Sequence, residues 1–422
     1  MVKREKYLEK LRNLRDVNLI KVVTGIRRAG KSTLFKQFQE ELLASGVKAK
    51  NIIYLNLEEL ENAPLLNAHV LNNYIMKMVD KKQKNYVFLD EIQMVSEYER
   101  LVDSLFVKDF IDLYITGSNA YFLSSDLATL LTGRYIEIPV MPFSFAEFVS
   151  GYSINTFSDG KITYNGTNMY NGVIGKSKIE IFNDYLSYGG FPEVLNLLNA
   201  GKKKEIGNYL SGVYTSILEK DIMKRCKIRS KFDFENLAKF MFDSIGNIVS
   251  PNNIANAMTS AGNKINKETV DNYLSQLTDS FVFYHAQRYD IKGKKLLQTL
   301  GKFYAVDLGF LSVIFNRELR FNSGHHLENI VFLELLRRGN RVNIGKAANT
   351  EIDFVVQTQQ GTTEYIQVAW TTKDESTFER EMRPFEMIKD FNKRILLTTD
   401  IEPVTIYKGI QKTNVINWLL ND

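Results

Sequence analysis

One stretch near the amino terminus has residues whose types and spacing could bind a phosphate chain. Residues 25–33 read Gly-Ile-Arg-Arg-Ala-Gly-Lys-Ser-Thr, which matches the pattern G-x-x-x-x-G-K-[ST]. Glycines let the backbone come close to phosphate oxygens, and successive backbone N–H groups can then face the anion. In this pattern Lys31 reaches the β- and γ-phosphates, and the Ser32 hydroxyl binds Mg²⁺. The stretch therefore predicts a nucleotide site with ATP and Mg²⁺ as cofactors.

The segments on either side of this loop agree with that prediction. An apolar run over 19–23 predicts a buried strand, and a helical pattern over 34–43 follows the loop. This order places the loop at a helix N-terminus, where unpaired N–H groups and the helix dipole favour an anion. The side chains of Arg27 and Arg28 either contact phosphate or face solvent, and the sequence supports both. The residues expected to bind the nucleotide are Gly25, Arg27, Arg28, Ala29, Gly30, Lys31, Ser32 and Thr33.

Two adjacent carboxylates, Asp90 and Glu91, directly follow the apolar run 86–89. Asp90 would hold Mg²⁺, usually through water, and Glu91 would orient and deprotonate the attacking water. A pair of acids at a strand end is a weak signal by itself, since a solvated strand end has the same composition. Its position after a phosphate loop makes it a strong one, and it predicts hydrolysis as well as binding.

Three further residues could complete such a site. Ser118 and Asn119 follow the next apolar run, 113–116, and so are expected at the same edge of the sheet, where ligands of open α/β sheets bind. They either contact the γ-phosphate or the attacking water, or serve as turn residues. Arg134 either senses the γ-phosphate or is a surface arginine before a strand.

The pattern of elements over 17–150 is that of an α/β domain with a parallel sheet. Strands and helices alternate, and the strands are continuous apolar runs, as in sheets buried on both faces. The strands are predicted at 52–56, 86–91 and 113–116, and the helices at 68–79 and 98–108.

Several motifs together resemble the AAA-type ATP-binding proteins of prokaryotes, in which a C-terminal domain of unknown function follows the ATPase core. They are the loop 25–33, Asp90-Glu91, Thr116-Gly117-Ser118-Asn119, Leu131-Thr132-Gly133-Arg134 and Pro142-Phe143-Ser144-Phe145-Ala146-Glu147-Phe148. The resemblance covers nearly the whole chain. It implies an AAA+-like P-loop core with an extra strand between the two Walker strands. It also implies Ser118 or Asn119 as the sensor and Arg134 as a functional arginine.

Composition narrows the class of protein. The 422 residues are enough for two to four domains, and 44% hydrophobic and 24% charged residues are ordinary for a globular protein. The single cysteine, Cys226, excludes an internal disulfide, and four histidines make a histidine zinc site unfavourable. A reducing, cytoplasmic location fits this usage. The sequence predicts no transmembrane helix and no secretory signal, and hence no membrane partner.

The middle of the chain predicts a linker and a helical region. Residues 151–180 read as a loop excursion, and 181–320 as helices that include a winged helix. Its wing is expected at the basic turn 290–295. Such a domain either binds DNA or serves as a rigid arm against the nucleotide or a protein partner. The net charge of +5 permits nucleic-acid binding without arguing for it.

The last region, 321–422, resembles the PD-(D/E)XK nuclease fold, also called restriction-endonuclease-like. There a helix acid, a strand Asp and an (Glu/Gln)-x-Lys strand meet around Mg²⁺. Glu328 matches the helix acid, Asp353 the metal Asp, and Gln367 the Glu position. Ala369 stands where the pattern has lysine. Because Gln367 lacks a charge and Ala369 lacks the amine, we predict a nuclease-like domain without nuclease activity.

The residues therefore predict an ATP-hydrolysing AAA+-type protein with its ATPase domain at 1–150. In this hypothesis the nucleotide state repositions the winged-helix and nuclease-like domains, with DNA or a protein as the target. The alternatives are a non-enzymatic, ATP-controlled DNA-binding regulator and a DNA nuclease regulated by ATP. The sequence does not predict the oligomeric state, and so it leaves open whether Arg134 acts in cis or in trans.

Overall fold

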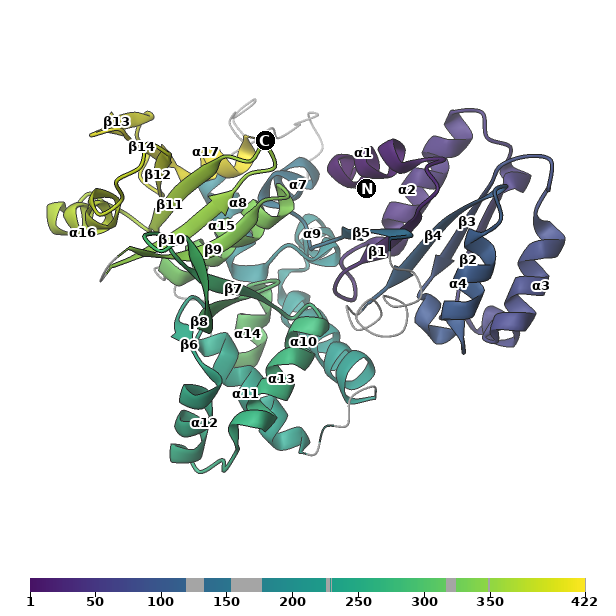
Figure 1. The fold of residues 1–422 in the computed structure, drawn as a ribbon, viewed down its shortest axis with the longest axis horizontal. Helices are drawn as coiled ribbons and strands as arrows, with labels where there is room; N and C mark the ends of the chain where they lie inside the picture. Colours follow the sequence, from purple (N-terminus) through teal and green to yellow (C-terminus); the bar gives the residue numbers. More distant parts are fainter. Residues whose placement is uncertain are drawn as a thin grey trace. The chain divides into compact units, whose positions relative to one another are not determined.

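The computed structural model divides the chain into two compact units (Figure 1). It describes residues 1–118, 133–152, 177–224, 228, 230–315, 324–347 and 350–421. The first unit is Met1–Pro142 with Asp279–Phe281, and the second is Phe143–Thr278 with Val282–Asp422. Within the described residues, no helix has the length and apolar character needed to cross a membrane.

The first unit is built on a five-stranded parallel sheet with the order β2-β3-β4-β1-β5. β4 lies between β1, which leads into the phosphate loop, and β3, which leads into Asp90 and Glu91. This is the extra strand that the resemblance to AAA-type proteins implies. The strands are β1 (Ile20–Thr24), β2 (Ile52–Asn56), β3 (Asn85–Asp90), β4 (Ile111–Gly117) and β5 (Tyr135–Pro139).

Helices cover both faces of this sheet. On one face, an apolar cluster includes Val22, Val87 and Ile115 of the strands and side chains of α3 and α4. On the other, Phe35 and Phe38 of α2 pack edge-on against Phe88. The alternation of side chains along each strand therefore gives the domain two cores. The helices are α1 (Glu5–Leu14), α2 (Lys31–Ala44), α3 (Ala68–Met78) and α4 (Tyr98–Phe106), with the short turns η1 (Ala49–Asn51), η2 (Leu60–Leu65) and η3 (Ile92–Met94).

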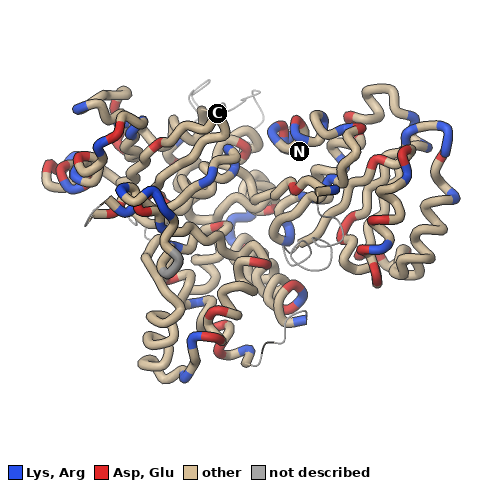
Figure 2. Tube along the Cα trace, viewed as in Figure 1, with Lys and Arg blue, Asp and Glu red and all other residues tan. Residues whose placement is uncertain are grey.

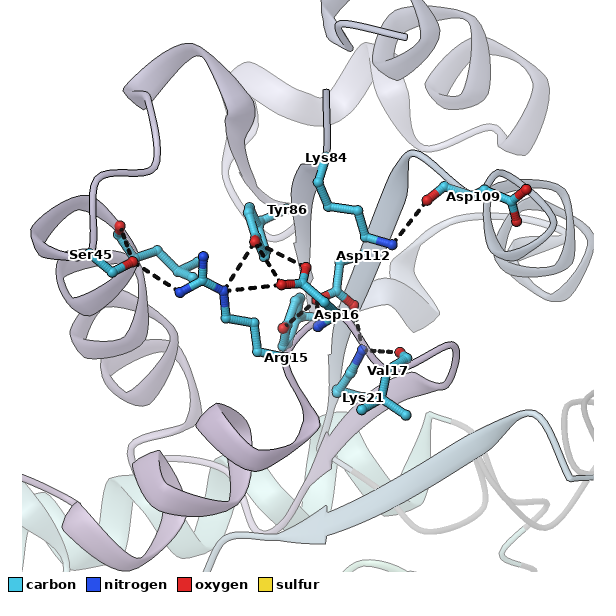
Figure 3. Close-up of polar contacts among 11 residues, drawn as sticks. Arg15, Asp16, Val17, Lys21, Ser45, Lys84, Tyr86, Asp109 and Asp112 are labelled. Carbon is cyan, nitrogen blue, oxygen red and sulfur yellow. Dashed lines mark hydrogen bonds and ion pairs between the residues drawn. The ribbon is translucent and has the colours of Figure 1, made fainter. Parts of the chain in front are cut away.

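At the amino ends of the strands, a buried polar network surrounds Lys21 and Asp112 (Figure 3). The Lys21 ammonium, 0% exposed, donates to the Asp112 carboxylate and to the Val17 carbonyl oxygen. Asp112 also accepts from the Tyr114 hydroxyl at 2.8 Å and the Asp16 backbone N–H at 2.9 Å. Burial lowers the pKa of Lys21, and the adjacent Asp112 charge opposes this. The network gives hydrogen-bond partners to buried polar groups that would destabilise the fold if they were unpaired.

The second unit contains a nine-stranded sheet with the order β13-β14-β12-β11-β10-β9-β7-β8-β6. β7 pairs in parallel with β9, so strands from the middle and the last regions share one sheet. The division expected near residue 320 therefore falls between strands of one sheet, and this long-range pairing has no local sequence signal. The strands are β6 (Ile248–Val249), β7 (Phe283–Asp290), β8 (Lys295–Ala305), β9 (Arg341–Ala347), β10 (Thr350–Gln357), β11 (Thr363–Ala369), β12 (Lys393–Thr398), β13 (Thr405–Tyr407) and β14 (Ile410–Asn414).

The middle region has the order of elements on which the winged-helix prediction rests. Three helices, α11, α12 and α13, precede the antiparallel hairpin of β7 and β8, and β6 pairs with β8. The turn of that hairpin, the expected wing, lies beside β9, since the Ile291 N–H donates to the Lys346 carbonyl at 3.1 Å. The helices are α7 (Phe145–Gly151), α8 (Lys178–Tyr188), α9 (Pro192–Asn199), α10 (Ile206–Ser216), α11 (Lys231–Asp243), α12 (Pro251–Ser260), α13 (Lys267–Asp279), α14 (Gly309–Phe315), α15 (Gly324–Arg337), α16 (Glu375–Glu386) and α17 (Val415–Leu420), with η4 (Lys203–Glu205) and the π-helix η5 (Ile217–Met223).

Candidate functional site

The phosphate loop connects the end of β1 to the start of α2. Gly25 has φ 133°, and a Cβ there would lie 2.0 Å from the Val140 carbonyl oxygen, so this position requires glycine. Gly30, with φ 101°, is the N-cap of α2 and provides no side-chain cap. The first backbone N–H groups of α2 are therefore not capped by that residue and can serve an anion.

Lys31 lies within the loop, with its side chain 4% exposed. Its ammonium donates to the carbonyl oxygens of Gly25 at 2.8 Å and Ile26 at 3.3 Å. It lies 3.8 Å from the nearest Glu91 carboxylate oxygen. Hydrogen bonds to a phosphate oxygen are charge-assisted and stronger than those to neutral carbonyls. A bound phosphate could therefore take over these contacts.

The other loop residues differ in their surroundings. Arg27 donates to Glu58 at 2.8 Å, whereas Arg28 is exposed and has φ 70°. Ala29 is buried. Ser32 and Thr33, both half-buried, lie in the first turn of α2. The Ser32 hydroxyl is thus on the same turn as Lys31, as a Mg²⁺ ligand in this motif must be.

Asp90 and Glu91 lie at the carboxyl end of β3, and both are buried. Asp90 accepts hydrogen bonds from the Tyr54 hydroxyl at 2.9 Å and the Thr116 hydroxyl at 2.5 Å. The Thr116 oxygen in turn accepts the Glu91 N–H at 2.8 Å. Glu91 itself has φ 57°, a left-handed conformation that is uncommon for residues other than glycine.

Three side chains to which the sequence gives no role hold these acids. Tyr54 and Thr116 fix the two Asp90 oxygens, and Gln93 donates from its amide to the Glu91 carboxylate. Burial raises the pKa of Tyr54, and the adjacent Asp90 charge adds to this, so its hydroxyl stays a donor. Two of them have a sequence signal, since Gln93 lies two residues after Glu91 and Thr116 begins the motif Thr116-Gly117-Ser118-Asn119, whereas Tyr54 lies on another strand and has none.

The donor set suits a hard cation. In the described part of the chain Asp90 has no lysine or arginine partner, and its hydrogen-bond donors there are neutral hydroxyls. Carboxylate and hydroxyl oxygens are the ligands that Mg²⁺ prefers. Asp90 and Ser32 are therefore chemically suited to hold Mg²⁺ with a bound triphosphate.

Of the remaining candidate residues, Ser118 lies at the same edge of the sheet as the phosphate loop and Arg134 does not. Ser118 is buried and follows Gly117, which pairs with Thr24 at the end of β1. It therefore lies at the same edge of the sheet as the loop. Asn119 lies outside the described residues.

Arg134 lies at the opposite end of β1 from the phosphate loop. Its carbonyl oxygen accepts the N–H of Ile20, the first residue of β1, at 2.9 Å. Its half-exposed guanidinium donates to Asp103 at 2.6 Å. A strand of this length separates the two ends by more than an arginine side chain can span. Arg134 therefore does not reach the phosphate loop of its own chain.

Arg4, a buried residue that no sequence pattern predicts at the site, holds the phosphate loop by hydrogen bonds to its backbone. The Arg4 guanidinium donates to the carbonyl oxygens of Ala29 at 3.1 Å and Met141 at 2.9 Å. It thus joins the phosphate loop to the chain that follows β5. No local pattern identifies this residue, which lies just before α1 near the start of the sequence.

Comparison with known proteins identifies the first unit. Residues 17–149 match a family model described as an AAA domain, and residues 179–320 match a domain of unknown function. An uncharacterized protein of Haemophilus influenzae is 36% identical over 100% of this chain and 99% of its own length. The chain belongs to the same family as that protein. An uncharacterized protein of Methanocaldococcus jannaschii is 28% identical over 92% of this chain and 85% of its own length.

The AAA-type domain has the fold of P-loop ATPases. The Walker-type ATPase of Pyrococcus abyssi aligns with a TM-score of 0.51 at 16% identity, over 75% of this chain and 96% of its own length. At that identity the likeness concerns the fold alone. The parallel sheet and the phosphate loop of this chain agree with it.

A second polar cluster lies in the second unit. The structure brings Glu328 of α15, Asp353 of β10 and Gln367 of β11 together, and adds Lys302 of β8. The Lys302 ammonium lies 2.9 Å from Glu328, 2.5 Å from Glu351 and 3.9 Å from Asp353. No sequence pattern predicts Lys302 or Glu351 at this cluster. Lys302 reads as an ordinary strand lysine.

The charges in this cluster perturb one another. Burial opposes the charge on Lys302, but Glu328, Asp353 and Glu351 outweigh it and raise the pKa of Lys302. Burial, followed by the Glu328 charge, raises the pKa of Asp353 well above its usual range. Burial also acts to raise the pKa of Glu328, but Lys302 and the hydrogen-bond donors around it lower it on balance.

The side chain of Ala369 has apolar neighbours. It belongs to an apolar cluster with Met382 and Phe385 of α16 and Leu396 of β12. A lysine at this position would start within that cluster. The nuclease interpretation of this region remains a prediction from the sequence.

Proposed function

We propose that this chain binds ATP with Mg²⁺ in its phosphate loop and hydrolyses it to ADP and phosphate. The observation that carries the proposal is the meeting of Lys31, Asp90 and Glu91, with 3.8 Å between the Lys31 ammonium and the Glu91 carboxylate. Phosphoryl transfer depends mainly on positioning and on neutralising charge, and these residue types supply both.

In this proposal each side chain has one task. Lys31 and the N–H groups at the start of α2 hold the β- and γ-phosphates. Glu91 orients the attacking water and accepts its proton. Bound by Asp90 and Ser32, Mg²⁺ would neutralise charge on the phosphates. Ser118, and Asn119 beyond the described residues, are candidates to sense the γ-phosphate.

The same proposal gives the nucleotide state a route to the second unit. The chain that leaves β5 passes directly beside the loop, since the Val140 N–H donates to the Thr24 carbonyl at 2.8 Å. Arg4 binds both the loop at Ala29 and this exit segment at Met141. A change in the backbone of the loop on nucleotide binding would therefore shift the backbone at Pro142, the boundary between the units.

The Glu91→Gln variant tests the catalytic assignment. It should bind ATP as the unaltered chain does and lose turnover, because the amide cannot accept the proton of the attacking water. Glu61→Gln, at an exposed position in η2, is the matched control and should retain turnover. Normal hydrolysis by Glu91→Gln would show that Glu91 is not the base.

A second candidate function is ATP-controlled DNA binding, with or without hydrolysis. Figure 2 shows basic and acidic residues interspersed along the trace. The turn between β7 and β8 nevertheless lies beside the end of β9, and the two together expose four lysines. Phosphate-backbone binding requires such local positive charge. The lysines are Lys292, Lys294, Lys295 and Lys346.

The ATPase rate with and without DNA separates the two candidates. Strong stimulation favours a motor, tight binding with negligible turnover favours a regulator, and no binding indicates a protein partner. Exchanging the four exposed lysines for glutamine should weaken DNA binding and reduce its salt dependence. The same exchange at Lys81 and Lys82, which are exposed in the first unit, is the control.

A further inference from the structure

We propose that the ammonium of Lys302 takes the place of a divalent cation between Glu328 and Asp353, so that this centre binds no catalytic metal. The inference does not depend on the proposed ATPase activity. It concerns the positions where the resemblance to nucleases implies Mg²⁺.

The contacts of Lys302 carry the proposal. The residue is 3% exposed and extends from β8 between α15 and β10. One Glu328 oxygen accepts both Lys302 and the Tyr304 hydroxyl, the latter at 2.6 Å, and the other lies 3.3 Å from His325 Nδ1. A divalent ion placed here would meet the ammonium at close range and would have to displace these donors.

The remaining positions are also engaged. The backbone N–H of Val368 donates to one Asp353 oxygen at 2.8 Å. The Gln367 side-chain oxygen accepts the Asp353 N–H at 3.2 Å, while its amide donates to Glu381 at 2.8 Å. Within the described residues, no group of three or more histidine, cysteine or acidic side chains is arranged to hold a metal. With the Lys302 ammonium in place, the donor set therefore does not fit a catalytic cation.

Irregularities in the sheet explain how Lys302 reaches this position. The register of β7 and β8 shifts between Gln287 and Arg288, where extra residues of β8 are accommodated just before Gly301 and Lys302. The register of β9 and β10 shifts between Ile352 and Val355, the interval that contains Asp353. Such bulges redirect side chains. The result is an ion-pair cluster that joins β8 to α15 and β10.

The alternative is that Lys302 is part of a working metal site, which predicts metal binding in the unaltered chain. If Lys302 instead supplied the amine missing at Ala369, a metal would bind beside it at Asp353 in the unaltered chain. Titration of the nucleotide-free, full-length chain with Mn²⁺ alone, followed by electron paramagnetic resonance, distinguishes the two. We expect Asp353→Asn to bind as much Mn²⁺ as the unaltered chain does.

The Lys302→Gln variant tests the cation role directly. Removal of the ammonium should create a Mn²⁺ site about tenfold or more tighter than any in the unaltered chain. That site should disappear in the double variant Lys302→Gln/Asp353→Asn. Lys295→Gln, an exposed lysine on the same strand, is the control and should gain no site.

Three results would overturn the proposal. The first is a Mn²⁺ site in the unaltered chain that is lost in Asp353→Asn. The second is a folded Lys302→Gln variant that gains no site. The third is Mg²⁺- or Mn²⁺-dependent cleavage of plasmid DNA that is lost in Asp353→Asn. If Lys302→Gln fails to fold, the comparison of the unaltered chain with Asp353→Asn still decides the matter.

Discussion

The two ends of the parallel sheet in the first unit each hold a buried lysine, but the two lysines have different partners. At the carboxyl ends of the strands, Lys31 donates to two backbone carbonyls and lies 3.8 Å from Glu91. At the amino ends, Lys21 is paired directly with the buried Asp112 carboxylate (Figure 3). The hydrogen bonds of Lys31 go to neutral carbonyls, which a phosphate can replace, and its nearest carboxylate is at 3.8 Å, whereas Lys21 donates a hydrogen bond directly to a carboxylate.

Burial alone does not show whether a lysine serves the fold or a ligand. A buried charge needs compensation, and where a carboxylate provides it the pair is structural. Where the hydrogen bonds go to carbonyls and the nearest carboxylate is at 3.8 Å, as for Lys31, the compensation is weaker, and an anionic ligand can add to it. Lys302 of the second unit resembles Lys21 in this respect, because carboxylates surround it.

The largest effect is expected for Lys31→Ala. Removing the ammonium removes the charge that holds the β- and γ-phosphates, so turnover should fall about a hundredfold to a thousandfold. The free energy of unfolding should change little, because Lys31 has no direct carboxylate hydrogen bond. Steady-state ATPase rates and urea unfolding measure the two quantities. Lys36→Ala, at an exposed position of the same helix, is the control. Retained turnover would remove Lys31 from the site.

At the other end of the sheet, Lys21→Met should affect stability. It leaves the Asp112 carboxylate buried without its partner, which typically costs about 3–5 kcal/mol. The double variant Lys21→Met/Asp112→Asn should recover much of this loss, since the amide is neutral and can still accept from Tyr114. Urea unfolding of the three chains measures the difference. If the double variant is as unstable as the single one, the loss comes from packing rather than from the stranded charge.

The sequence predicts the carboxyl end of this sheet better than the amino end. The phosphate loop is one continuous stretch of sequence, and so is the pair Asp90-Glu91, so each can be recognised locally. The strand expected at 52–56 is β2 (Ile52–Asn56). The pair of Lys21 and Asp112 joins residues that are far apart in sequence, as do Arg4 with Met141 and Lys302 with Glu328. Whether such a lysine is buried depends on which strands become neighbours, and no local pattern contains that information.

Arg134 tests whether the two ends of the sheet cooperate between chains. It lies at the amino end and does not reach its own phosphate loop, so a catalytic role requires a second copy. In that case Arg134→Ala should keep ATP affinity and lower turnover about tenfold or more. A mixture of Arg134→Ala and Lys31→Ala chains should then regain part of the activity, because a Lys31→Ala chain can offer its arginine to an intact loop. Unchanged turnover in Arg134→Ala would leave Arg134 with a structural role, in its contacts with Asp103 and the Phe106 ring.

The smallest effect concerns Asp400 of the second unit. Its carboxylate is buried and accepts hydrogen bonds mainly from Thr371 and Thr372. Burial would raise the pKa of its carboxyl, but hydrogen bonds from Thr371 and Thr372 and the Lys412 ammonium outweigh this and lower the pKa to about 2. Because the folded-state pKa lies below the usual value, the carboxylate stabilises the fold above about pH 4, and this contribution is lost as the pH falls toward 2.

Asp400→Asn should therefore lower the free energy of unfolding by about 1–2 kcal/mol near neutral pH. The difference between the two chains should shrink as the pH is lowered from 4 toward 2, which urea unfolding over that range would measure. A difference independent of pH would mean that the amide fails for geometric reasons, by presenting its NH₂ group to a donor. Glu402→Gln is a matched control, because its exposed side chain also contacts Lys412 but carries none of the threonine hydrogen bonds. It should change the stability less than Asp400→Asn does, since an exposed ion pair contributes little.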